Sequence, residues 1–223
     1  MSDVKGSPVV KSPSRNTADS DATKLLRVTR DGMLLADYLT NLALQGRIFL
    51  ASDADENDTI TGATSYAATT PMLVLDVPSG TTAIPLSLNL RQAGTVAGGI
   101  ITVTIAIETA KIRYSSGGTA ETNIISSRTD KPVSPKCTLY SLPTAAAAGT
   151  AAAIFHDIVA QDVSPASADA QRFTIDWPAP GHTFAPKFLV GPASFLVFAY
   201  AATTGPTWQW ALSFAEVPSS DLT

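Results

Sequence analysis

Three segments of the chain alternate apolar and polar residues with a period of two, and this alternation constrains the fold more than any other feature. The apolar positions are Ile84, Leu86, Leu88 and Leu90; Ile101, Val103, Ile105 and Ile107; and Trp208, Trp210, Leu212 and Phe214. Because successive side chains of a strand point to opposite faces, each segment predicts a β-strand with one buried and one outward face. The chain is therefore expected to be an all-β, antiparallel protein.

The outward positions of the same segments contain no charged residue. They are Pro85, Ser87, Asn89, Thr102, Thr104, Ala106, Gln209, Ala211 and Ser213. Charged residues make up only 15% of the whole chain, against about 25% in a typical soluble domain. One interpretation is a neutral surface rich in Thr and Ser. The interpretation that we favour is that other subunits cover much of the exterior, since the cores of interfaces are depleted of charge.

Further strands are expected between clear turn signals such as Pro78-Ser79-Gly80 and Gly117-Gly118. The full set of predicted strands is 47–51, 71–77, 84–92, 100–108, 111–114, 121–127, 137–141, 153–160, 171–177, 187–190, 194–201 and 207–217. The alanine-rich stretch 144–153 is predicted to be a loop. Many short strands between Gly and Pro turns favour an antiparallel β-sandwich, with the jelly roll as the expected type.

Two regions are predicted along the chain: an extended N-terminal arm over residues 1–30 and a β-sandwich domain over residues 31–223. The first 24 residues are rich in Ser, Asp, Lys, Pro and Thr, so they cannot bury enough apolar surface to order by themselves. We expect the arm to lie across neighbouring subunits of an assembly. One short helix is predicted between Asp31, a possible N-cap, and Gly46, a possible C′ residue.

The arm is basic and the remainder of the chain is acidic. Residues 1–30 carry a net charge of +3, and residues 31–223 carry −7. The arm has no dense arginine cluster and the whole chain is acidic, which argues against direct binding of nucleic acid. We expect the arm to dock on a protein surface. Its candidate partner-contact residues are Lys11, Arg15, Lys24, Arg27 and Arg30.

No catalytic, cofactor-binding or metal-binding motif is found, so neither an enzyme nor a bound cofactor is expected. His156 and His182 are the only histidines, and neither belongs to a recognisable catalytic arrangement. The stretch SDADENDTITG resembles a calcium loop, but Asp58 and Thr64 stand where such a loop requires Gly and Glu. Its acidic residues predict a solvated loop, with an irregular cation site as the alternative.

The single cysteine, Cys137, cannot form an internal disulfide, and no signal-peptide core or uninterrupted apolar stretch of 18 residues is present. These features predict a protein made in a reducing cytosol with no membrane contact. Trp208 and Trp210 are expected in the core. Trp177, at a strand end, is the candidate for an exposed aromatic residue that could stack on a sugar.

The segments PMLVLDVPSGTTAIPLSLNL, IITVTIAIE and TWQWALSFAEVP combine low charge with strand alternation. In these segments the chain resembles virion structural proteins of tailed bacteriophages, in particular auxiliary capsid proteins of the decoration or cement type. The resemblance implies a homo-oligomer, with a trimer as the expected form, that binds and stabilises an assembled shell. Its partners would be the major capsid protein or other virion subunits, and its location the virion, assembled in the host cytoplasm.

Two other functions remain open from the sequence. One is a jelly-roll subunit that forms the shell itself. The other is a carbohydrate-binding module or receptor-binding spike domain, which an exposed Trp177 near Asp176 and Gln171 would favour.

Overall fold

The computed structural model describes residues 9–10, 24–25, 38–53, 55, 58–93, 99–146, 151–161, 172–176, 188–201 and 206–222. The chain divides into two units, Met1–Leu42 and Ala43–Thr223. In the first unit, β1 (Val9–Val10) pairs antiparallel with β2 (Lys24–Leu25), with Val9 opposite Leu25. The predicted boundary between residues 30 and 31 lies outside the described residues and stays a prediction.

The predicted short helix is present as α1 (Tyr38–Leu44). It ends where the sequence suggested, because Gly46 adopts a φ of +72° and donates its backbone N–H to the carbonyl of Ala43 at 2.9 Å. This left-handed conformation is the usual C′ termination of a helix and favours glycine. The predicted N-cap, Asp31, lies outside the described part of the chain.

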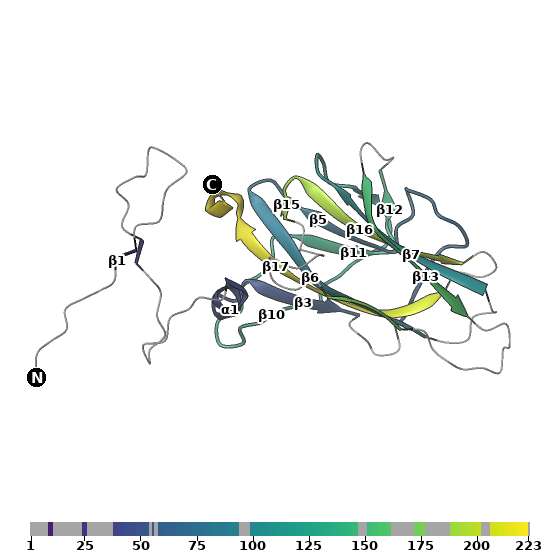
Figure 1. Ribbon diagram of the computed structural model, residues 1–223, viewed down its shortest axis with the longest axis horizontal. Coiled ribbons are helices and arrows are strands. Elements are labelled where there is room, and N and C mark those ends of the chain that lie inside the picture. The colour runs from purple at the N-terminus through teal and green to yellow at the C-terminus, as the bar shows by residue number, and fades with distance from the viewer. Residues whose placement is uncertain are drawn as a thin grey trace, which may run out of the picture. The chain divides into compact units, whose positions relative to one another are not determined.

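The second unit contains two large antiparallel sheets stacked face to face (Figure 1). The seven-stranded sheet has the order β10 (Ile124–Ser126), β3 (Ile48–Ser52), β17 (Thr207–Pro218), β6 (Thr81–Gln92) and β14 (Arg172–Asp176). In addition, β15 (Leu189–Val190) pairs with β6, and β4 (Ile60–Thr61) pairs with β17.

The six-stranded sheet has the order β13 (Ala152–Gln161), β7 (Gly99–Glu108), β16 (Ala193–Ala201), β5 (Leu73–Val77), β11 (Thr138–Ser141) and β9 (Thr119–Ala120). A separate two-stranded ladder joins β12 (Thr144–Ala145) to β8 (Tyr114–Ser116). A 3₁₀-helix, η2 (Ser219–Leu222), follows β17. The all-β antiparallel sandwich with one short helix is the fold class that the sequence predicted.

The strand pairs are nested within one another along the chain. The outermost pair is β3 with β17, followed by β5 with β16, β6 with β14, and finally β7 with β13. In these four pairs, strands from the first half of the domain pair with strands from the second half in reverse order, as in one long hairpin whose turn lies between β7 and β13. Contacts of β17 with β6 and of β16 with β7 join these pairs into the two sheets.

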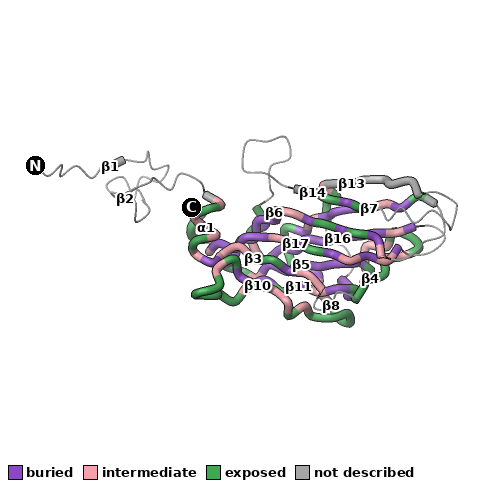
Figure 2. The backbone as a smooth tube through the Cα atoms, turned by 90° about the horizontal axis from the view of Figure 1, so that it is seen from below, coloured by how far each residue is buried: buried purple, intermediate pink, exposed green. Residues whose placement is uncertain are grey.

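The main hydrophobic core lies between the sheets and draws side chains from both. Phe49, Leu88 and Phe214 come from the seven-stranded sheet, and Leu75 and Phe195 come from the six-stranded sheet. The rings of Phe49 and Phe214 stack with their centroids 5.5 Å apart. Trp208 and Trp210 are buried in this core, as the alternation predicted. In Figure 2 the purple of buried residues runs along β5, β16 and β17.

Three local predictions were wrong in part: residues 121–123 form no strand, because β10 begins only at Ile124. Residues 111–113 form no strand, because the backbone N–H of Arg113 donates to the side chains of Asp76 and Ser194 instead of to a neighbouring strand. The predicted loop 144–153 contains β12 and the start of β13. Here the pairing of Thr144 and Ala145 with β8 outweighs the weak strand preference of an alanine-rich segment.

The outward positions of β7 are not all exposed to solvent, contrary to the expectation from the alternation. Thr104 and Ala106 are buried, with exposed fractions of 1% and 3%. Ala106 packs with Val74, Leu196, Phe198 and Ala145 in a second hydrophobic cluster, on the outer face of the six-stranded sheet. The segment that carries Ala145 therefore covers part of the outer face of this sheet.

Candidate interaction surfaces

Part of the outer face of the seven-stranded sheet is uncharged across three strands, β3, β17 and β6, and is bordered on β14 by Asp176, which lies opposite Ser87. We call this region the neutral face and define it as Leu50, Ser87, Asn89, Ala211 and Ser213. The strand register places Leu50 opposite Ser213, and Ser213 opposite Ser87; in the next row Ala211 lies opposite Asn89. Residues directly opposite on antiparallel strands share a face, so these side chains form one continuous surface.

Large apolar side chains are exposed at the β10 margin of the neutral face. Leu50 is 56% exposed, and Ile125, its register partner on β10, is 55% exposed. The polar side chains of the face bond to one another: the hydroxyls of Ser87 and Ser213 are 2.7 Å apart, and Thr174 donates to the Asn89 amide oxygen at 2.9 Å. Covering the face would therefore bury few unsatisfied polar groups.

The neutral face ends at a pair of cations. Arg91 on β6 lies opposite Arg172 on β14, and both are exposed. Together with Asn89, Gln209 and Ala211 they line a shallow hollow of about 270 Å³. One end of the sheet is thus cationic, while the end near Leu50 and Ile125 is apolar.

On the opposite sheet, a buried polar network holds the covering segments in place. The Arg113 guanidinium donates to the carbonyl of Ala146 at 2.7 and 3.0 Å and to the carbonyl of Ala68 at 2.9 Å. It also lies 3.9 Å from the buried carboxylate of Glu108. The Asp76 carboxylate accepts from the backbone N–H groups of Arg113 and Tyr114, each at 3.1 Å. These contacts join the strands to the segments that cover them.

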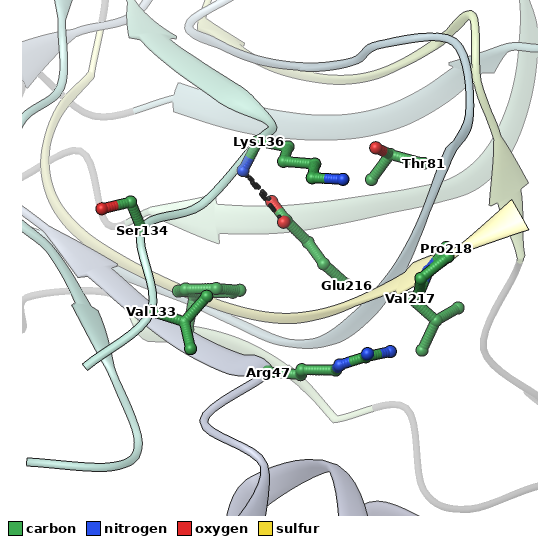
Figure 3. Close-up of a pocket in the computed structure, with 9 residues that line it drawn as sticks. Arg47, Thr81, Val133, Ser134, Lys136, Glu216, Val217 and Pro218 are labelled. Atoms are coloured by element: carbon green, nitrogen blue, oxygen red, sulfur yellow. Dashed lines mark hydrogen bonds between the residues drawn. The ribbon is translucent and has the colours of Figure 1, made fainter. Parts of the chain in front are cut away.

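Another buried carboxylate, that of Glu216 on β17, anchors the segment that precedes β11 (Figure 3). Its two oxygens accept the backbone N–H of Lys136 at 2.9 and 3.1 Å and that of Cys137 at 2.8 Å. The adjoining pocket has a volume of about 150 Å³ and is lined by Arg47, Val133 and Val217 among others. Burial, together with the charge of Glu216, raises the pKa of the Cys137 thiol, so this buried cysteine stays protonated.

The acidic loop after β3 places Asp53, Asp58 and Glu121 near one another. Partial burial raises the pKa of Asp53 to about 6, and the charges of Glu121 and Asp58 add to this effect. Asp55 and Asp58 are exposed, and Glu56 lies outside the described residues. Within the part of the chain that the structure describes, no three His, Cys, Asp or Glu side chains are grouped so that they could hold a metal ion.

The structure places only part of the predicted contact set. Lys24 lies in β2, opposite Val10, whereas Lys11, Arg15, Arg27 and Arg30 fall outside the described residues. Their contact with a partner stays a prediction. His156 lies on β13, while His182 and Trp177 are not among the described residues.

Sequence reasoning missed the buried charges Asp76, Glu108, Arg113 and Glu216. A signal for three of them was available, because each carboxylate stands alone within or at the end of an apolar strand, as in LVLDV and ITVTIAIE. A buried carboxylate requires hydrogen-bond donors. The identity of those donors, mostly backbone N–H groups of distant segments, is not readable from the sequence.

Comparisons with models of protein families, with curated proteins and with solved structures found no match to this chain. Among the described helices, none has the length and hydrophobicity that crossing a membrane requires.

Proposed function

We propose that this chain is a non-enzymatic virion structural protein that binds and stabilises a tailed-phage capsid shell as a decoration protein. The phage context comes from the sequence resemblance. The observation that supports a contact role most directly is the neutral face, at whose margin Leu50 and Ile125 are more than half exposed. Charge depletion and exposed apolar side chains are the composition expected at the core of an interface.

The proposal is tested by adding purified protein to phage shells that lack it and measuring the bound fraction by sedimentation. Leu50→Asp replaces an exposed apolar side chain of the neutral face with a charge, so the apparent Kd is expected to rise about tenfold or more. Ile112→Asp is the matched control, because Ile112 is 50% exposed on a segment remote from β3 in sequence and outside the seven-stranded sheet. Equal binding by both variants would remove the neutral face from the proposal.

The predicted arm is tested in the same assay. Deletion of residues 1–24 is expected to weaken attachment, because several weak contacts on one particle act together through a high effective concentration. Unchanged attachment would limit the contact to the sandwich unit.

A second candidate, a shell-forming subunit, is favoured by the strand nesting. Antiparallel pairs β3–β17, β5–β16, β6–β14 and β7–β13, distributed over two sheets, support a jelly roll, a fold used by viral capsid subunits. Electron microscopy of the purified protein separates the two functions. A shell-forming subunit produces closed particles by itself, whereas a decoration protein binds only preformed shells.

A further inference from the structure

A second surface lies beside the neutral face, at the free edge of β10. A hollow of about 600 Å³ is lined by β10 and by the segment that leads to β11; we call it the β10 groove. Its principal residues are Glu121, Ile124, Ile125, Pro132, Val133 and Pro135. Ile125 and Val133 are 55% and 44% exposed, so the groove presents apolar side chains to solvent.

Both walls of the groove are held in place by hydrogen bonds. On one side, β10 pairs with β3, and the backbone N–H of Ser127 donates to the carbonyl of Ile48 at 2.7 Å. On the other side, the Glu216 carboxylate accepts the backbone N–H of Lys136 (Figure 3) and that of Cys137. A preformed groove loses little conformational entropy when a ligand binds.

The groove suits an extended peptide segment. Among the described strands, β10 pairs only with β3, so one side of its backbone is available for addition of a strand. Pro132 and Pro135 on the opposite wall have no backbone N–H, so neither residue can donate a backbone hydrogen bond to close that edge. A short segment with β-branched side chains would fill the space between the two walls.

The charges of the groove favour a basic segment. Glu121 lies at one end, and Asp53 and Asp58 are close enough for their charges to act on one another. Lys136 also lines the groove, but its side chain runs toward Thr81, in the neighbouring pocket (Figure 3). The complementary segment of this chain is its arm, which carries a net charge of +3 against −7 for residues 31–223.

We propose that the β10 groove of one copy binds the arm of a second copy through Val9 and Val10, with Lys5 and Lys11 near the acidic end. Val9 and Val10 already form a strand, β1, whose ladder with β2 is only two residues long. Such a short pair is marginal by itself and can be exchanged for a longer contact. The inference deepens the proposed function, because it supplies the contact by which neighbouring copies join on a shell.

Disulfide trapping between full-length chains tests the contact without any shell. A Val9→Cys chain is mixed with a differently tagged Val133→Cys chain under mild oxidation, and the mixed dimer is measured on a non-reducing gel. Val190→Cys is the matched control, because Val190 is 48% exposed on β15 and is not among the residues that line the groove. We expect about tenfold more dimer with Val133→Cys than with Val190→Cys, since docking raises the local thiol concentration. Mixing Val9→Cys with the unmodified chain measures the background from buried Cys137.

Equal yields with the two partners would overturn the proposal. A Val9→Cys/Val133→Cys chain that forms only the intramolecular disulfide at high protein concentration would also overturn the proposal, because the arm would then occupy the groove of its own chain.

A second measurement uses Val133→Asp. This variant should weaken self-association about tenfold in sedimentation equilibrium, whereas Val190→Asp should leave it unchanged. If Val133→Asp weakens self-association but Val9→Cys forms no crosslink, the groove binds another part of the second copy, and the proposed role of Val9 and Val10 is overturned. Shell attachment is measured separately, so it can fail while trapping succeeds, or the reverse.

Discussion

At the residue scale, two of the described charged groups show opposite outcomes of removing charge from water. Asp53 is partly buried beside Glu121 and Asp58, and Arg113 is completely buried among backbone carbonyls and Glu108. The two differ in their partners. Ionisation of the partly buried Asp53 carboxyl costs free energy. The Arg113 guanidinium, in contrast, donates hydrogen bonds to the carbonyls of Ala68 and Ala146 and lies beside the Glu108 carboxylate.

Asp53→Asn is expected to stabilise the protein at neutral pH. The folded pKa of Asp53, about 6, lies above its value of 3.8 in an unfolded chain. The wild-type carboxyl therefore contributes stability below pH 3.8 that is lost as the pH rises through 6. Because the group is partly exposed, we expect a gain of about 1 kcal/mol from the variant at pH 7.5, shrinking toward acid pH. Urea unfolding at pH 7.5 and at acid pH measures this gain in the free energy of unfolding, and Asp55→Asn, at an exposed position, is the control. A loss of stability at pH 7.5 would contradict the assignment.

Arg113→Met is expected to destabilise the protein by about 3–5 kcal/mol, the usual cost of removing one partner of a buried ion pair. The variant would leave Glu108 without its cation and the carbonyls of Ala68 and Ala146 without their donor. Lys111→Met, two residues away at an exposed position, should change the unfolding free energy by less than about 0.5 kcal/mol. Comparable effects of the two substitutions in chemical denaturation would show that Arg113 does not hold the covering segments.

At the element scale, turns and edges determine how the strands meet. The Gly117-Gly118 turn predicted from the sequence joins β8 to β9, and both glycines have positive φ angles. Gly118 also approaches the β11 backbone: a Cβ at this position would lie 2.3 Å from the carbonyl oxygen of Ser141.

Gly118→Ala should therefore lower the free energy of unfolding by more than a substitution at a glycine where the positive φ angle is the only source of strain. Gly80 has a similar φ of +79°, with open space around the added methyl group. We expect Gly80→Ala to cost about 1–2 kcal/mol and Gly118→Ala about 1–3 kcal/mol more, because the backbone of β11 must move. Thermal unfolding of the two variants measures the difference. Equal melting temperatures would show that the turn shifts without cost.

Strand positions were largely predictable because alternation survives wherever one face of a strand is buried. The predicted segment 207–217 agrees with β17 to within one residue, and 194–201 agrees equally well with β16. Prediction failed where a distant partner decides the outcome. Arg113 leaves a predicted strand to bond Asp76 and Ser194, and Ala106 packs with Ala145 and Phe198, which are far from it in sequence. The neutral face was foreseen in part; the β10 groove, which needs two separate segments, was not.

At the scale of the whole molecule, a basic arm and an apolar sheet face would respond differently to salt. If both contact a shell, raising NaCl from about 0.05 to about 0.5 M should weaken the arm contact by screening and leave the apolar contact largely intact. Replacing Lys11, Arg15, Lys24, Arg27 and Arg30 with Gln should abolish the salt dependence of shell attachment, whereas Leu50→Asp should preserve it. Sedimentation of bound protein across the salt series measures both. If shell attachment of the Gln variant still depends on salt, the ionic contact is made by residues other than these five.

The outermost strand pair has a consequence for the ends of the sandwich. Ile48 lies opposite Ala215, and just beyond them Arg47 forms an ion pair with Asp221 at 3.2 Å. The polypeptide thus enters and leaves the sandwich at the same pole. Such proximity makes the unit a natural candidate for circular permutation. A reporter fused after Thr223 would lie near the start of β3 and leave the far ends of β3 and β17 unencumbered.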